Sequence, residues 1–186
     1  GGTVYVPTGI YLITSTLTVP NSFIHILGDG SYSSTLKFEP TSNGLACLEV
    51  ISGSSVVYSG SIQGIGFTSA NSSFAKVALR VWDISTYLID DIVIRGTVEV
   101  PGIGNFWSGG VGGSTGMVFR GREATSISNV KISADAPIVI GTNPNFPAID
   151  IDHFKFENLY LVANGNPAVV ILSDVNLTQV EFCGYF

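Results

Sequence analysis

A six-residue pattern of apolar and polar positions recurs five times along the chain. Apolar residues hold its first, fourth and sixth positions, and a turn-forming or amide residue holds its third. The copies begin 27, 38, 29 and 21 residues apart and cover Ile62–Phe67, Ile89–Ile94, Ile127–Ile132, Phe156–Leu161 and Leu177–Phe182. Repeats at such intervals are typical of stacked folds, in which each unit buries its apolar face against its neighbours. Within each copy the pattern is strand-like and not helical, so the repeat predicts a β-solenoid.

A second apolar strand is predicted ahead of every copy. These segments are 46–50, Leu79–Trp82, Met117–Arg120, Ile149–Asp152 and Val169–Leu172. No segment shows a helical period over the ~10–15 residues of a crossover helix. We therefore expect an all-β chain forming a right-handed, single-stranded parallel β-helix of about five to six coils. Two stretches, 96–116 and 134–147, interrupt the period and are expected to be loops on one flank.

The first 40 residues are expected to form a separate N-terminal lead-in unit. Strand-like pieces at 3–6, 10–13, 16–19, 23–27 and 35–38 alternate there with turn signals. Residues 41–186 then carry the coils. Because strands reach both ends without a cap to protect the open edges, we expect a segment of a longer chain that continues beyond a truncated C-terminus. The alternative is a protomer whose ends are covered by partners.

The third positions of the repeat are expected to lie above one another at a turn. They are Gly64, Asp91, Asn129, Asn158 and Gln179. Asn and Asp tolerate left-handed backbone, and their side chains either hydrogen-bond along the stack or serve as turn residues alone. Both alternatives are structural.

Composition excludes several function classes. The 186 residues are 45% hydrophobic and 12% charged, with a net charge of −6. Eight widely spread basic residues speak against a nucleic-acid partner, and the longest apolar runs are far short of the ~20 residues of a membrane helix. No acidic cluster resembles a calcium site, so we expect no metal and no cofactor. Cys47 and Cys183 are expected to lie too far apart for a disulfide and to be packing residues.

Strand alternation turns one set of side chains outward on the second strand of each unit. This set includes Arg80, Trp82, Arg120, Asp150 and Asp152. We expect stacking to bring them onto one outer face, where aromatic rings stack on sugars and arginines pair with acidic sugars. Trp107, within the glycine-rich 96–116 stretch, is the further substrate-binding candidate.

Asp150 and Asp152 are the candidate catalytic residues. Side chains two positions apart on a strand share a face about 6.6–6.8 Å apart. Inverting glycosidases hold their two carboxyl groups ~6.5–9.5 Å apart to leave room for a water molecule. The alternative meaning of the pair is a solvated strand surface.

The N-terminal residues resemble a known superfamily. Residues Gly1–Ile13 read GGTVYVPTGIYLI, and Leu17–Pro20 (LTVP) and Ile26–Gly30 (ILGDG) follow. This run resembles the N-terminal segment of the pectate-lyase-like β-helix superfamily, which includes bacteriophage tailspikes, capsular depolymerases, polygalacturonase-like and pectate-lyase-like enzymes. The resemblance implies the fold over essentially the whole chain and transfers no catalytic residue. Asp90 and Asp91 occur here without the Gly-His-Gly of polygalacturonases.

We carry forward three functions. The first is a segment of a phage tailspike or related fibre in the virion tail, which binds bacterial capsule or O-antigen polysaccharide and, if enzymatic, depolymerises it. Abundant Gly, Ser and Thr, and outward apolar residues such as Val118, Val170 and Leu172, favour this function and a homotrimer. The second is a secreted cellular polysaccharide hydrolase or lyase. The third is a structural β-helical fibre protein without catalysis.

Overall fold

A computed structural model of the protein describes most of the chain. It covers residues 1–51, 56–70, 73–97, 99–100, 104–105, 107–110, 113–141, 150–164, 166–171 and 176–185, with the backbone alone at 99–100, 104–105, 121–123, 150–153 and 176–185. All regular elements of the described residues are β-strands, and none of these residues is helical. The expected all-β class is confirmed.

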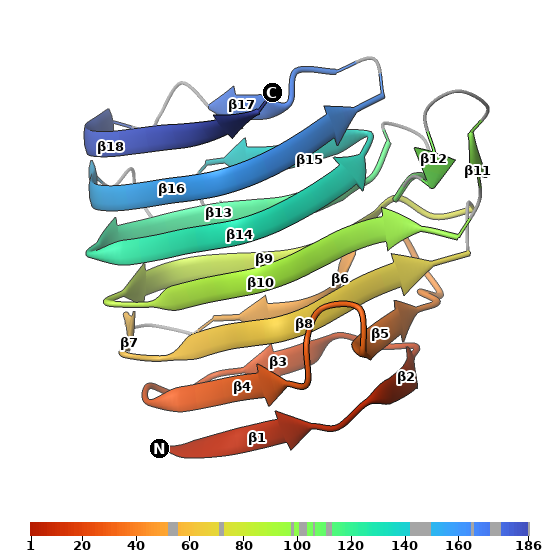
Figure 1. Ribbon diagram of the computed structural model, residues 1–186, viewed down its shortest axis with the longest axis horizontal. Helices are drawn as coiled ribbons and strands as arrows, with labels where there is room; N and C mark the ends of the chain where they lie inside the picture. The colour runs from red at the N-terminus through yellow and green to blue at the C-terminus, as the bar shows by residue number, and fades with distance from the viewer. Residues whose placement is uncertain are drawn as a thin grey trace.

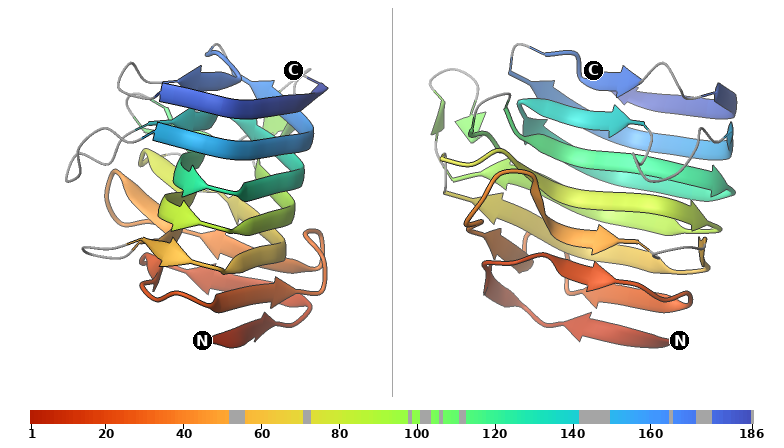
Figure 2. Two further views of the ribbon diagram at one scale, coloured as in Figure 1. Left: turned by 90° about the vertical axis from the view of Figure 1, so that its left-hand side faces the viewer. Right: turned by 180° about the vertical axis from the view of Figure 1, so that it is seen from behind.

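Two parallel sheets face each other across the core (Figures 1 and 2). The front sheet of Figure 1 runs in the order β1 (Gly2–Val6), β4 (Ile24–Gly28), β8 (Ser61–Ser69), β10 (Leu88–Gly96), β14 (Thr125–Ala134), β16 (Asp150–Ala163) and β18 (Asn176–Tyr185). In this sheet β2 (Gly9–Ile13) pairs with β5 (Ser34–Phe38), which in turn pairs with β8. The back sheet runs β3 (Leu17–Val19), β6 (Leu45–Val50), β9 (Lys76–Ser85), β13 (Thr115–Glu123), β15 (Ala136–Ile140) and β17 (Val169–Ile171), with β7 (Val57–Tyr58) beside β9.

The chain alternates between the two sheets. From β8 to β18, each strand of the front sheet is followed by one of the back sheet, apart from a short antiparallel pair, β11 (Glu99–Val100) and β12 (Gly104–Asn105), between β10 and β13. Every strand pair within the two large sheets is parallel. The strand pieces predicted within residues 1–40 are also found, as β1 to β5.

The first four repeats stack in register. Ile62 pairs with Ile89, Ile89 with Ile127, and Ile127 with Phe156. All twelve side chains at the first, fourth and sixth positions of these copies are at most 5% exposed. Full burial of each such side chain contributes about 1.5–3 kcal/mol, so the repeat supplies one wall of the core.

The third position explains how the repeat buries its apolar residues. Strict alternation would turn the first and fourth residues to opposite faces. Gly64, Asp91, Asn129 and Asn158 instead adopt left-handed backbone, with φ of 66°, 51°, 54° and 53°. This single residue reverses the alternation, so the first, fourth and sixth side chains all point inward. The third positions of the stacked strands form one line, which we call the corner.

The register of the fifth copy was predicted wrongly. Leu177 pairs with Ile151 rather than Phe156, and Phe156 pairs with Phe182. The reason is that Ile151, Phe154 and Phe156 carry the same apolar spacing as Phe156, Leu159 and Leu161. Two overlapping stretches of β16 therefore match the apolar positions of the pattern, and the apolar spacing alone does not distinguish them.

The second strand was also misassigned in one unit. Leu48, Leu79, Met117, Ile138 and Val169 form a continuous inward row of the back sheet. Residues 136–140, expected to lie in a loop, thus form the back strand β15, whereas 150–152 begin the front strand β16. The five residues of β15, APIVI, are all apolar or small and are enough for a short back strand. The alternation between front and back strands therefore continues through residues 136–140.

Candidate functional site

A short segment between β4 and β5 arches across the outer face of the front sheet and carries Tyr32 (Figure 1). The Tyr32 side chain is 61% exposed. Its neighbour Ser31 donates two hydrogen bonds to the Asp91 carboxylate, from its backbone nitrogen at 3.1 Å and its hydroxyl at 2.6 Å. The segment therefore holds an aromatic ring over the sheet through the backbone and hydroxyl bonds of Ser31.

The base of the same segment is fixed at Asp29. Its carboxylate accepts hydrogen bonds from the Tyr5 hydroxyl and from the Thr8 backbone nitrogen, the latter at 2.7 Å. These bonds, that of Tyr5 first, hold the pKa of Asp29 below its ordinary value because they favour the ionised form. The segment is thus bonded to the lead-in strands at one end and to the corner at the other.

Outward side chains of three neighbouring strands face Tyr32. Val93, Lys131 and Tyr160 occupy the fifth position of their repeats and pair directly across β10, β14 and β16. Tyr160 is 53% exposed, and Lys131 is also exposed. Arg95 follows Val93 by two positions and is exposed on the same face of β10.

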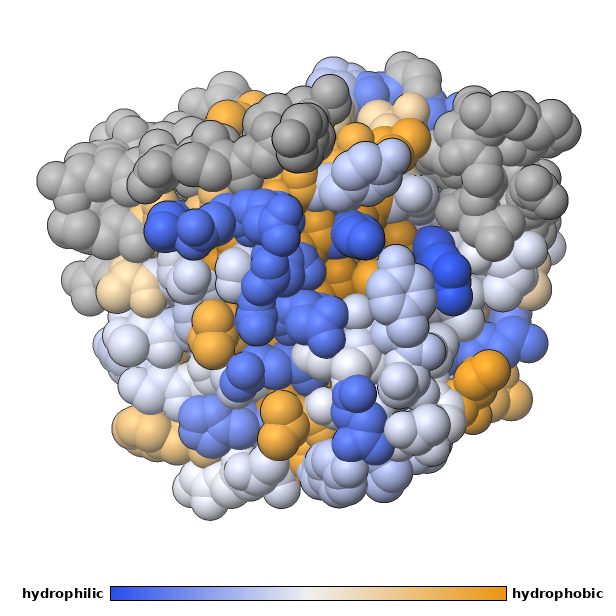
Figure 3. Space-filling view, in the orientation of Figure 1, coloured by the Kyte–Doolittle hydropathy of each residue, from blue (hydrophilic) through white to orange (hydrophobic). Residues whose placement is uncertain are grey.

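These residues line a continuous groove. A cavity of about 260 Å³ lies among Tyr32, Val93, Ile94, Arg95, Lys131, Ser133 and Tyr160. A hollow of about 600 Å³ shares Tyr32 and Arg95 and extends toward β2, and another of about 150 Å³ shares Tyr32, Lys131 and Tyr160 and extends to the corner. We call this surface the Tyr32 groove. Figure 3 shows its face of the molecule, where hydrophilic side chains surround exposed apolar atoms.

Two cations approach the Tyr32 ring. The Arg95 guanidinium carbon lies 5.3 Å from the ring centroid, and the Lys131 Nζ lies 6.0 Å from it. Both distances are within the range of cation–π attraction. The ring therefore has a basic group on each of two neighbouring strands.

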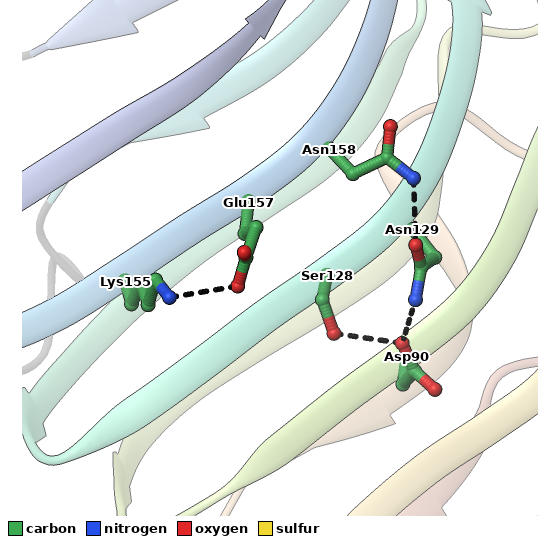
Figure 4. A network of polar contacts seen from close by, with 6 residues as sticks. All are labelled: Asp90, Ser128, Asn129, Lys155, Glu157 and Asn158. Carbon is green, nitrogen blue, oxygen red and sulfur yellow. Dashed lines mark hydrogen bonds and ion pairs between the residues drawn. The ribbon is translucent and has the colours of Figure 1, made fainter.

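An amide ladder borders the groove at the corner (Figure 4). Asn158 Nδ2 donates to Asn129 Oδ1 at 2.7 Å, and Asn129 Nδ2 donates to Asp90 Oδ1 at 2.8 Å. Ser128 donates to the same Asp90 oxygen at 2.7 Å. Of the two alternatives for the third positions, hydrogen bonding along the stack is therefore observed at Asn129 and Asn158. Asn129 and Asn158 are exposed and also line the smaller hollow.

Arg80 and Trp82 lie on the outer face of the back sheet, as expected. The Arg80 guanidinium is 4.9 Å from the Trp82 ring, and it donates to Glu49 at 2.9 Å and to the Gly44 carbonyl at 2.8 Å. Arg80 and Trp82 thus lie on the sheet opposite the Tyr32 groove. Their role in binding a substrate stays a prediction.

Arg120 and Trp107 are placed differently from the expectation. Arg120, expected on the exposed outer face, pairs in register with Trp82 but is 2% exposed, and its Nε lies 3.4 Å from the buried Asp83 carboxylate. Trp107 is fully buried, stacked on Phe38 at a centroid distance of 6.4 Å with Lys76 over its ring. Burying a ring of this size removes a large apolar area from water, so the loop turns it inward.

Asp150 and Asp152 do not join Arg80 on one face. They lie at the start of β16 in the front sheet, where they pair with Asn176 and Thr178. Tyr160 follows Asp152 by eight residues, up to about 26 Å along an extended strand, so the pair is also remote from the Tyr32 groove. Their side chains lie outside the description, and their catalytic role stays a prediction.

The sequence contained a signal for the Tyr32 groove. Fifth positions of stacked repeats must lie side by side, and those of three copies are Val93, Lys131 and Tyr160. The position of Tyr32 had no such signal, because the arch between β4 and β5 depends on the bonds of Ser31 and Asp29.

Metal and membrane sites are not seen in the described part of the chain. There, no three or more His, Cys, Asp or Glu side chains are grouped to hold a metal ion. None of its elements is a helix long and apolar enough to span a membrane. Cys47 is a free, buried thiol whose pKa is raised by burial, while the side chain of Cys183 is not described.

Comparison with known proteins gives one structural resemblance. No family model matches the chain, and no curated protein sequence matches it. The chain is similar to the solved structure of the ORF18 protein of Geobacillus virus E2, with 15% sequence identity and a TM-score of 0.45. The match covers 100% of this chain and 54% of that one, so the chain spans about half the length of the viral protein.

Proposed function

We propose that the chain is a right-handed parallel β-helix segment of a phage tailspike or related fibre that binds bacterial surface polysaccharide. The alternation of strands between two parallel sheets supports the solenoid, because each front strand and the back strand that follows it add one layer to the stack. In the same proposal, this segment lies in a virion tail, where it contacts bacterial capsule or O-antigen.

The Tyr32 groove is the observation that carries this proposal. Two exposed tyrosine rings lie in one groove with the amides of Asn129 and Asn158. Aromatic faces stack on the apolar faces of sugar rings, and amides and hydroxyls bond sugar hydroxyl groups. A long sheet face also suits an extended chain of sugars, which a closed pocket would not admit.

Replacing the two tyrosines tests the groove. We expect Tyr32→Ala and Tyr160→Ala each to weaken binding to bacterial polysaccharides on a glycan array by about tenfold, through loss of a stacking face. Tyr58→Ala is the matched control, since Tyr58 is 49% exposed and lies outside the groove. Equal binding by all three variants and the parent would remove the groove from the proposal.

A secreted polysaccharide hydrolase or lyase is the second candidate, and Asp150 with Asp152 is the observation that favours it. Positions two apart on a strand share a face, so the spacing of Asp150 and Asp152 in the sequence of β16 is the one that an inverting pair requires. If the pair hydrolyses the bound glycan, Asp150→Asn with Asp152→Asn should abolish release of reducing ends while leaving binding unchanged. Cleavage that persists in the double variant would exclude these carboxylates. A parent protein that binds the glycan without cleaving it would exclude the enzyme and support a fibre that only binds.

A further inference from the structure

We propose that the Tyr32 groove selects sugars that carry a negative charge, with the anionic group held between Arg95 and Lys131 beside the Tyr32 ring. This inference rests on the proposed glycan binding and specifies its substrate class. It follows from the arrangement of the eight basic side chains of this chain, whose net charge is −6.

Most of the basic side chains are already engaged. The sequence has eight, and the side chain of Arg122 is not described. Five others have a defined partner: Lys37 with Glu39, Lys76 with the Ser108 carbonyl, Arg80 with Glu49, Arg120 with Asp83, and Lys155 with Glu157.

Arg95 and Lys131 are the remaining two, and they line the same cavity. Within the described part of the chain neither forms an ion pair with a carboxylate. Both are exposed, and both lie against the face of Tyr32, at 5.3 and 6.0 Å from its centroid. An aromatic ring orients a cation without neutralising its charge, so both charges remain available to an anion.

Among the described residues that line the groove, Asp91 has the one carboxylate, and it restricts where the anion binds. Asp91 lines the smaller hollow at the corner. Both of its oxygens accept hydrogen bonds from Ser31, and this holds the arch that carries Tyr32. Its negative charge disfavours an anion at the corner, so we place the anionic group on the Arg95 side of Tyr32. The neutral hydroxyls of the sugar then face the amides of Asn129 and Asn158.

The chemistry of the two cations accepts a carboxylate or a phosphate. Arg95 offers a planar fork of donors that matches either group, and Lys131 adds a point charge. Uronate-containing capsules and phosphate-linked surface polymers are therefore the two sources to separate by experiment.

The test uses printed bacterial polysaccharides in four forms. They are uronate-containing capsular polysaccharides, the same polymers with their carboxyl groups reduced to hydroxymethyl groups, phosphate-linked surface polymers, and neutral polysaccharides. We expect binding to the native uronates, the phosphate polymers or both, with at least a tenfold loss on carboxyl reduction if the anion is a carboxylate. Binding should also weaken as ionic strength rises.

Charge-removing variants identify the residues. Arg95→Gln with Lys131→Gln should lower affinity for the acidic polymer about tenfold or more and remove most of its salt dependence. Lys155→Gln is the matched control on the same sheet, because Glu157 already neutralises Lys155 at 2.8 Å. The Gln substitutions keep long polar side chains at exposed positions, and thermal unfolding checks that the fold is retained.

The outcomes separate this inference from the proposed function. Equal binding to native and carboxyl-reduced polymers, with no preference for phosphate polymers, would overturn the charge selection and leave glycan binding in place. The same holds if the Arg95 and Lys131 variant binds acidic polymers as the parent does. No binding to any of the four forms would overturn both proposals.

Discussion

Trp107 and Tyr32 are aromatic residues of two irregular segments, and their surroundings give them opposite roles. Trp107 joins the front sheet through a parallel bridge with Ala134, and its backbone nitrogen donates to the Ser133 carbonyl at 2.8 Å. That bond turns the ring into the core. Tyr32 lies on an arch whose hydrogen bonds are made by Ser31, which leaves its ring over the outer face. The residue type determines the chemistry of the side chain. The backbone and neighbouring hydrogen bonds determine whether that side chain lies in the core or on the outer face.

We predict that Trp107→Ala lowers the free energy of unfolding by about 3–5 kcal/mol, because it empties a buried site next to Phe38. Glycan binding by the folded protein should not change. Denaturant unfolding and the glycan array measure the two effects. Trp82→Ala is the control, since Trp82 is partly exposed and its loss should cost less than half as much. A selective loss of binding in Trp107→Ala without a loss of stability would return this residue to the binding site.

At the scale of the element, the corner determines which repeats stack. Left-handed residues at successive third positions reverse the side-chain alternation at the same level in β8, β10, β14 and β16. The ladder through Asp90, Asn129 and Asn158 then links three of these strands from outside the core. Its polar bonds are exposed and contribute modestly, so we attribute most of the effect to backbone conformation.

Asn129 offers a direct test of that attribution. We expect Asn129→Ala to destabilise the protein by about 1–3 kcal/mol, because alanine is strained at a φ of 54° and the amide bonds are lost. Asn129→Gly loses the same amide bonds, but glycine adopts this φ without strain. It should therefore be about 1 kcal/mol more stable than the alanine variant in denaturant unfolding. Equal stability of the two variants would mean that the lost stability comes from the hydrogen-bonded ladder and not from the backbone conformation.

At the scale of the whole molecule, the two sheets present different outer faces. The front sheet carries the Tyr32 groove. On the back sheet, Val118, Val139 and Val170 form an outward row in direct register, each partly exposed. Leu172, expected beside them, lies outside the described residues. A row of β-branched residues at the surface of a stacked fold is the type of surface that subunits bury, and we propose that it packs in a homotrimer.

Light scattering on the purified protein tests the trimer. We expect the mass of three chains for the parent and of one chain for Val139→Lys, because a buried, unpaired ammonium disrupts the interface. Val162→Lys, at a partly exposed valine of the front sheet, should remain trimeric. A parent protein that is monomeric would contradict the proposed assembly and favour a secreted enzyme.

The sequence by itself determined the class of the fold and most of its strands. Apolar residues at the first, fourth and sixth positions can be buried together only if a residue between them reverses the alternation, and Gly64, Asp91, Asn129 and Asn158 are residues that do so without much strain. The inward rows of β8 to β16 therefore follow from local chemistry repeated along the chain. The division into a lead-in unit and coils stays a prediction.

Only the tertiary structure decided the register of β18, the sheet that holds Asp150, and the position of the groove. Leu177 had two matching partners in β16, and the choice depends on how the whole strand pairs. Tyr32 meets Arg95 and Lys131 across 63 and 99 residues of sequence because an arch is bonded to Asp91. Such contacts depend on distances between segments remote in the chain. The periodicity of a single strand contains no information about them.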